Sequence, residues 1–141
     1  MNPIYLAILA AISFGVWTIF HKVASPYINQ IFGAIIVSVV AVIVGLIVLM
    51  PRFKSVELFT DWKGIFFVVL AGISAFFIDF LALSAYSKGL PVSVGGPIII
   101  GGSIALASII GFFMGESVSL LKVLALVLII GGASILAFFS K

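Results

Sequence analysis

Apolar residues fall into five long runs that are separated by short polar breaks. The runs cover residues 4–20, 31–50, 65–86, 92–114 and 120–139. A helix needs roughly 20 residues to cross a bilayer, and the runs match that length. They do not alternate apolar with polar residues, and each exceeds the ~10 residues of a membrane barrel strand. The pattern predicts an all-α integral membrane protein, in which a single domain over residues 1–141 forms a bundle of five transmembrane helices.

One polar stretch, residues 51–63, separates the second run from the third. It interleaves charged and aromatic side chains, namely Arg52, Lys54, Glu57, Asp61 and Lys63 with Phe53, Phe59 and Trp62. Aromatic rings and long basic side chains are both stable at the boundary between lipid and water. We therefore expect this segment to lie along the membrane interface.

Composition restricts the class of protein further. Of the 141 residues, 65 % are hydrophobic and 8 % are charged, whereas about a quarter of the residues of a soluble domain are charged. Five helices leave little chain for a soluble enzyme, an aqueous receptor domain or a nucleic-acid-binding module. The chain has no cysteine and one histidine, so we expect neither a metal site nor a cofactor. The expected location is the plasma membrane of a bacterium or archaeon, where the chain would contact the lipid bilayer.

The basic residues give little information on orientation. An odd number of spans places the two termini on opposite sides of the membrane. Four basic residues then lie on the side of the N-terminus and three on the other side: Arg52, Lys54, Lys63 and Lys122 against Lys22, Lys88 and Lys141. The positive-inside rule favours an internal N-terminus only weakly. This balance leaves open that the chain inserts in both orientations.

Asp79 is the only charged residue well inside a run. A charge in the middle of a membrane costs about 2.5 to 3.5 kcal/mol on insertion scales, so it marks a candidate functional site. Helical spacing places Asp79 on one face with small residues and Tyr86, about 10 Å from the nearer membrane surface. We interpret the residues near this depth as a substrate-binding layer. Its candidate residues are Asp79, Trp17, Ser38, Gly96, Pro97, Ser134 and Tyr86.

Several members of this layer have side-chain or backbone chemistry that suits ligand binding. The Asp79 carboxylate would supply charge, and Trp17 would supply a cation–π contact. The sequence Gly95-Gly96-Pro97 would interrupt its helix and free backbone groups for hydrogen bonding. Such a layer suits a small cation or polar molecule, and contains no catalytic set.

Structural interpretations stay open beside the functional one. Asp79 could bind a serine hydroxyl, a backbone amide, or His21 or Lys22 from the first helix. Trp17 and Tyr86 could belong to the aromatic belt at the interface. We interpret His21, at the end of the first run, as an interfacial residue rather than a proton carrier.

Small residues recur every four positions in the fourth run, at Ser103, Ala107, Gly111 and Gly115. Such a stripe lets two helix backbones approach closely. We expect it to be a packing surface, which could include the contact between two copies of the chain.

Four segments of the chain have a recognisable pattern: residues 12–22 (ISFGVWTIFHK), 82–94 (ALSAYSKGLPVSV), 113–119 (FMGESVS) and 128–132 (LIIGG). Together they resemble the EamA-type module of the drug/metabolite transporter superfamily. The resemblance implies a five-helix half transporter that moves small metabolites or cationic compounds by alternating access. Larger relatives join two such halves in inverted orientation. It also implies a homodimer, whose two copies are antiparallel in the related small multidrug resistance proteins.

The sequence departs from those small relatives at one point. They carry a glutamate in the first helix for proton exchange, whereas residues 1–20 contain no acid. Their coupling mechanism does not carry over, and Asp79 is the only deep candidate for it. A channel and a non-transporting membrane partner, or assembly subunit, remain alternatives. We do not expect an enzyme, because catalysis needs a second acid, base or metal ligand near Asp79.

Overall fold

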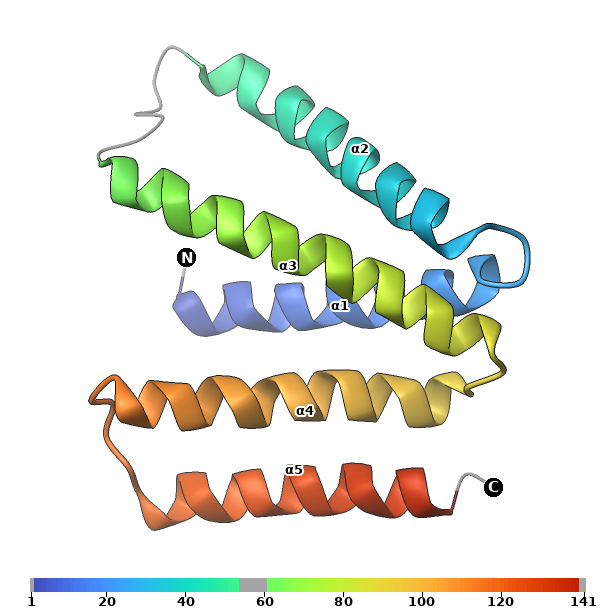
Figure 1. The fold of residues 1–141 in the computed structure, drawn as a ribbon. Helices are drawn as coiled ribbons and strands as arrows, with labels where there is room; N and C mark the ends of the chain where they lie inside the picture. The colour runs from blue at the N-terminus through green and yellow to red at the C-terminus, as the bar shows by residue number, and fades with distance from the viewer. Residues whose placement is uncertain (1, 54–60, 140–141) are drawn as a thin grey trace.

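The computed structural model describes residues 2–53 and 61–139, and these residues form five long helices (Figure 1). The elements are α1 (Pro3–Ala24), α2 (Gln30–Leu49), the short 3-10 helix η1 (Met50–Arg52), α3 (Trp62–Ser87), α4 (Val92–Phe113) and α5 (Leu120–Phe138). All five α-helices are long and apolar enough to span a membrane. The predicted all-α membrane fold is confirmed, with boundaries within four residues of the predicted runs. Much of the expected interfacial segment, residues 54–60, lies outside the described residues.

Polar residues in the breaks determine where the helices begin. The side-chain oxygens of Asn2, Asn29, Asp61 and Ser119 each accept a hydrogen bond from a backbone N–H in the first turn of α1, α2, α3 and α5. The backbone N–H groups of the first turn would otherwise lack a hydrogen-bond partner. The polar breaks therefore act as helix caps as well as boundaries.

The helices pack side by side in an open arrangement rather than a closed bundle. α2 packs against α3, α4 packs against α5, and α1 contacts both α3 and α4. Figure 1 shows the N-terminus and the C-terminus at opposite ends of the helices, as the odd number of spans predicts. The accessible surface is 10724 Å² for a mass of 14.9 kDa. A compact soluble monomer of that mass exposes about 7,000 Å², so the five-helix unit leaves wide apolar faces uncovered.

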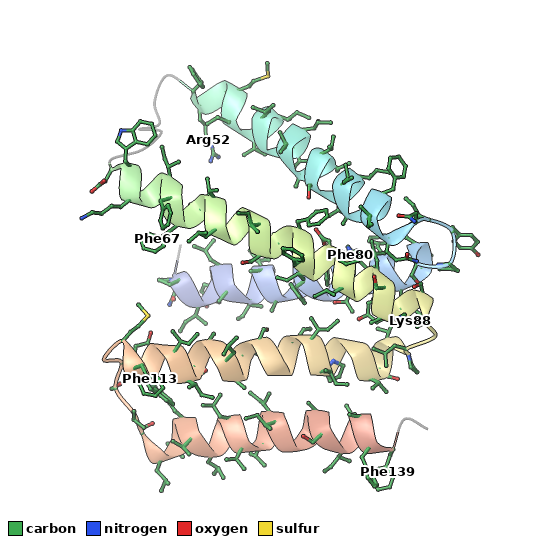
Figure 2. The ribbon with its side chains drawn as sticks, in the orientation of Figure 1. Arg52, Phe67, Phe80, Lys88, Phe113 and Phe139 are labelled. Atoms are coloured by element: carbon green, nitrogen blue, oxygen red, sulfur yellow. The ribbon has the colours of Figure 1, made fainter. Side chains whose placement is uncertain are left out.

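Side chains on these uncovered faces are almost all apolar. Figure 2 shows them on every helix, and Phe67, Phe113 and Phe139 among them are strongly exposed. No residue of α5 is buried among those that the structure describes. Lipid or another protein is expected to cover these faces, because they would aggregate in water.

Most of the buried core lies at one end of the helices. Its apolar members include Ala34, Ala82, Leu83 and Tyr86. They lie in the first turns of α2 and the last turns of α3, next to the connections from α1 to α2 and from α3 to α4. Packing is therefore tightest at the end where Asp79 was predicted to lie.

The helix α4 continues without interruption through Gly95, Gly96 and Pro97, so the predicted break is wrong. Proline removes the hydrogen bond to the carbonyl of Ser93, which is an exposed residue in the first turn of the helix. Because Ser93 is exposed, the loss of this hydrogen bond leaves no buried carbonyl without a partner. The two glycines serve close packing instead, since Gly95 faces the Tyr86 ring and Gly96 faces Thr18.

The predicted small-residue stripe is shorter than expected. α4 ends at Phe113, and Gly115 lies in the following turn with a φ of 92° that favours glycine. Ser103 and Ala107 are exposed, whereas Gly111 is covered by the Glu116 side chain. α5 packs on a different residue, Gly101, through Ile129 and Ala133. α4 therefore contacts α5 closely through the face that carries Gly101, and not through the predicted stripe of small residues.

The helices differ in length and direction. α3 has 26 residues and α5 has 19, which correspond to about 39 Å and about 28 Å at 1.5 Å per residue. In Figure 1, α2 and α3 run obliquely to α4 and α5.

Candidate functional site

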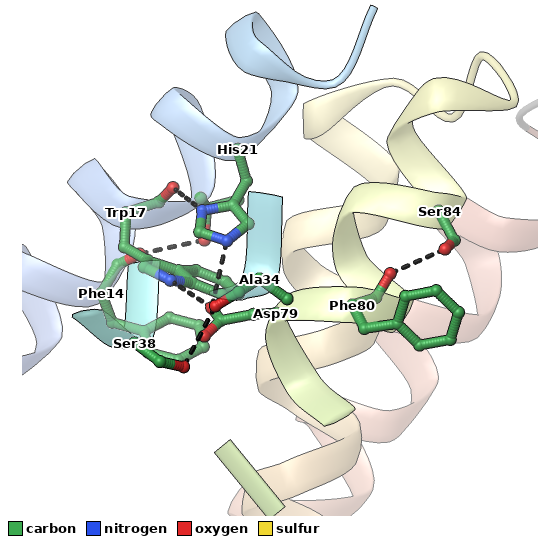
Figure 3. Close-up of polar contacts among 9 residues, drawn as sticks. Phe14, Trp17, His21, Ala34, Ser38, Asp79, Phe80 and Ser84 are labelled. Atoms are coloured by element: carbon green, nitrogen blue, oxygen red, sulfur yellow. Dashed lines mark hydrogen bonds and ion pairs between the residues drawn. The ribbon is translucent and has the colours of Figure 1, made fainter. Parts of the chain in front are cut away.

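Asp79 lies inside the membrane-spanning part of α3, eight residues before its end at Ser87. That spacing corresponds to about 12 Å along the helix. The residue is only 7 % exposed. Its Oδ1 atom accepts a hydrogen bond of 2.9 Å from the indole Nε1 of Trp17 in α1 (Figure 3). The structure therefore brings together the first two residues of the predicted layer.

His21 also contacts Asp79, which was one of the structural interpretations left open for that residue, and it is buried rather than exposed at the interface. Its Nε2 atom lies 3.0 Å from Asp79 Oδ1, and the residue is 4 % exposed (Figure 3). Depth estimated from residue number misplaces it, because side chains in a helix lean toward its N-terminus. The imidazole of His21 thus reaches back by about one turn to the level of Trp17. The spacing of Ser13, Trp17 and His21 at intervals of four was the signal for this contact.

Three rings of α1 contact one another in tilted pairs. The centroid of Trp17 lies 4.8 Å from that of Phe14 and 3.9 Å from that of His21. The indole face is a favourable neighbour for a cation. Trp17 therefore contributes a hydrogen bond to Asp79 and a π-face to His21.

The other nitrogen of His21 is held by the backbone. Its Nδ1 atom lies 3.0 Å from the carbonyl oxygen of Trp17. A carbonyl oxygen can only accept, so Nδ1 carries the hydrogen. This contact fixes the direction of the ring, and leaves Nε2 to face Asp79.

Two hollows meet at this cluster, which we call the Trp17–His21–Asp79 cluster. One, of about 440 Å³, is lined by Ala10, Ser13, Phe14, Trp17, Ala75, Ile78 and Asp79. The second, of about 260 Å³, is lined by Trp17, Phe20, His21, Ala24, Ile28, Gly33, Ile36, Val37 and Leu83. Trp17 belongs to both, so the cluster separates them. We call the first hollow the Asp79 pocket.

The remaining residues of the predicted layer lie in different surroundings. The Ser38 hydroxyl donates to the Ala34 carbonyl of its own helix. Gly96 and Pro97 line an apolar hollow of about 730 Å³ between α1, α4 and α5, which contains no ionisable side chain among those the structure describes. Ser134 borders another hollow, of about 240 Å³, between α4 and α5. These residues were predicted to lie at the same depth in the membrane as Asp79, but they do not share one site with it.

Tyr86 is buried at the end of the core, with 1 % of its surface exposed. The amine of Lys22 donates to its backbone carbonyl at 3.2 Å and lies 6.0 Å from the ring centroid. Tyr86 lines neither hollow of the cluster. Its position indicates a packing residue that anchors α1 and α4 to the end of α3.

Fold and site together define a multi-pass membrane protein with an ionisable cluster buried between two of its spans. In membrane proteins, such groups mark substrate or ion pathways. The family model of the EamA-like transporter family matches residues 1–138, and the chain belongs to this family. It is thus a membrane transporter of the drug/metabolite transporter type, as the sequence resemblance implied. No curated protein and no solved structure matches the chain.

Proposed function

We propose that the protein transports small metabolites or cationic compounds by alternating access, as a dimer of five-helix units in a bacterial or archaeal plasma membrane. The observation that carries this proposal is the buried carboxylate of Asp79, which borders an open pocket inside the membrane-spanning region. A charged side chain at that depth in the membrane costs free energy unless it is paired with another polar or charged group. Trp17 and His21 supply its partners from within the unit.

The pocket chemistry supports a positively charged or polar substrate. Asp79 is the only acidic side chain on the wall of the Asp79 pocket, and the aromatic rings of Phe14 and Trp17 lie beside it. A carboxylate and aromatic faces together bind organic cations. The remaining wall is made of small and aliphatic residues, together with the Ser13 hydroxyl.

The apolar faces that the five-helix unit leaves uncovered support its assembly with a second copy of the chain. The five-helix unit exposes about 3,700 Å² more than a compact soluble monomer of its mass. This area exceeds the roughly 1,000–2,500 Å² that each copy buries in an obligate dimer. The Asp79 pocket opens on such a face, so a second unit would enclose it. The inverted halves of larger relatives serve this purpose.

Uptake into vesicles tests the transport proposal. The purified full chain is reconstituted, a pH gradient is imposed, and accumulation of labelled tetraphenylphosphonium, amino acids and sugars is measured. Saturable accumulation of at least one class is expected. Flux that rises linearly with concentration would indicate a channel instead. Absence of flux for every class, with a stable complex formed with another membrane protein, would indicate the assembly-subunit alternative.

The orientation of the copies can be tested with single cysteines, since the chain has none of its own. Ser87→Cys and Ser117→Cys place an exposed thiol at opposite ends of the helices without changing the charge balance. For antiparallel copies, we expect an impermeant maleimide to label each variant partially in intact cells. Complete labelling of one variant and none of the other would contradict antiparallel insertion. Native mass spectrometry of the purified protein should show the mass of two chains.

A further inference from the structure

The hollow of about 730 Å³ between α1, α4 and α5 is separate from the Asp79 pocket. We call it the α1–α4–α5 hollow. On α1 it is bordered by Gly15 and Ile19, whereas the Asp79 pocket is bordered by Ser13 and Trp17. At 3.6 residues per turn, these two pairs lie on nearly opposite faces of the helix. A second copy that covers the Asp79 pocket therefore does not cover this hollow through the same contact.

The α1–α4–α5 hollow begins at one end of the helices and reaches the middle of the membrane. Its lining runs from Val92, the first residue of α4, to Ile104 of the same helix, and from Leu128 to Leu136 of α5. The segment of α4 corresponds to about 18 Å along the helix. One leaflet is half of the ~30 Å hydrocarbon thickness. The hollow thus has the depth of a lipid acyl chain that enters from one membrane surface.

Glycines on the wall leave the hollow open. A Cβ atom at Gly15 or at Gly132 would meet nothing within 4 Å, so these two residues are not needed for contact between the helices. Ile104 and Leu128 at the inner end are exposed, and the hollow is therefore accessible from the surrounding lipid. Acyl chains are as apolar as this wall. Hydrocarbon contact alone cannot select one lipid from the bilayer, and selection must come from the headgroup.

Two lysines lie at the mouth of the hollow. Lys22 is half-buried and follows Thr18, which lines the hollow, by four residues on the same face of α1. Its amine donates to the Tyr86 carbonyl at 3.2 Å, which holds it at the end of α3. Lys88 is exposed, and Figure 2 shows it at the connection that leads into α4, four residues before Val92. Both basic groups therefore lie where the headgroup of a lipid in the hollow would lie.

The charge at this end of the helices has one sign. The connections there, residues 25–29 and 88–91, contain no acidic residue. At the opposite end, Asp61 and Glu116 lie among the basic residues. An anionic headgroup at the mouth would thus be attracted by Lys22 and Lys88 without a nearby acid in these connections to repel it.

We infer that the α1–α4–α5 hollow is a binding site for one anionic phospholipid, with an acyl chain in the hollow and the phosphate at Lys22 and Lys88. Basic groups beside membrane spans bind anionic headgroups in this way. The lipid would fill the space between α1 and α5, which both contact α4 but do not contact each other within the described residues. The inference goes beyond the proposed transport function and does not depend on it.

Native mass spectrometry of the full chain in detergent tests the headgroup. Phosphatidylglycerol and phosphatidylcholine with identical acyl chains are added in turn, and one tightly bound phosphatidylglycerol per chain is expected. Lys88→Gln should weaken its binding about fivefold, the usual effect of one basic residue near anionic lipid. Lys63→Gln removes the same charge at the opposite end and should have no effect. Equal affinity of the unmodified protein for the two lipids would overturn the site.

Two adjacent glycines of α5 test the acyl chain. A Cβ atom at Gly131 or at Gly132 would meet nothing within 4 Å, but only Gly132 lines the hollow. Gly132→Leu should therefore lose the bound phosphatidylglycerol, whereas Gly131→Leu should retain it. Circular dichroism checks that both variants are folded, and Gly15→Leu fills the hollow from α1 if Gly132→Leu does not fold. Unchanged binding in a folded variant with a filled hollow would contradict the inference.

A photoactivatable phosphatidylglycerol locates the acyl chain without any variant. With a diazirine at the end of one chain, crosslinks are expected at the inner end of the hollow, near Ile104 and Leu128. Crosslinks spread evenly over all helices, α2 included, would indicate the general lipid shell and overturn the site. Loss of the dimer in Gly132→Leu, without crosslinks to the hollow in the unmodified protein, would place a second copy there instead of a lipid.

Discussion

Replacing Asp79 with asparagine is expected to reduce cation uptake driven by a pH gradient to the level of protein-free vesicles. The amide is close in size to the carboxylate, and its oxygen can still accept the hydrogen bond from Trp17 Nε1. It carries no charge, so it cannot attract a cation as the carboxylate does. The variant should therefore fold and insert normally but lose transport. Uptake of labelled tetraphenylphosphonium under an imposed pH gradient measures the loss.

Asp61→Asn is the matched control for this experiment. Asp61 caps the same helix at its other end by accepting from the Lys63 N–H, and asparagine caps helices equally well. We expect its uptake to equal that of the unmodified protein. Size-exclusion chromatography and circular dichroism should show that both variants are folded. Full uptake by Asp79→Asn would remove this residue from the transport mechanism.

Replacing Gly95 with alanine is expected to destabilise the protein by about 1 to 3 kcal/mol, the usual cost of overfilling a packed core. A Cβ atom at this position would lie 2.6 Å from Cε1 of the Tyr86 ring and 2.9 Å from Leu90 Cδ2. The Tyr86 ring is buried, so displacing it would disturb the residues packed around it. Unfolding by a denaturing detergent, followed by circular dichroism, measures the change in free energy.

Gly102→Ala is the matched control in the same helix. A Cβ atom at Gly102 would meet nothing within 4 Å, and alanine is favoured over glycine in a helix by up to about 1 kcal/mol. This variant should be as stable as the unmodified protein or slightly more stable. Equal stability of the two variants would show that α4 can move away from Tyr86 at little cost.

The sequence predicted the helices well because membrane spans leave a strong and simple signal. Each span is a long apolar run, and polar residues such as Asn29 and Ser119 lie where helices begin and serve as their caps. Gly95-Gly96-Pro97 gave the wrong prediction, because a proline near the start of a helix need not break it. Gly115 was misassigned since the four-residue spacing continued past the end of α4.

The site was predicted in part. Depth along the spans placed Asp79 and Trp17 at one level, and these two residues are hydrogen-bonded. Depth does not say which way a side chain points around its helix, so Ser38 and Ser134 shared that level without joining the cluster. His21 was named as one possible partner of Asp79 but was interpreted as interfacial, because its side chain reaches back to a level that its residue number does not indicate.

The unequal lengths of α3 and α5 have a consequence for the membrane around the protein. α5, about 28 Å long, matches the ~30 Å hydrocarbon thickness of a typical bilayer. α3, about 39 Å long, exceeds it and must tilt by roughly 40° to fit fully within it. Because α3 carries Asp79 while α1 carries Trp17 and His21, a change in tilt moves the carboxylate relative to its partners. Bilayer thickness is thus expected to modulate transport, with lipids of longer acyl chains holding α3 more upright.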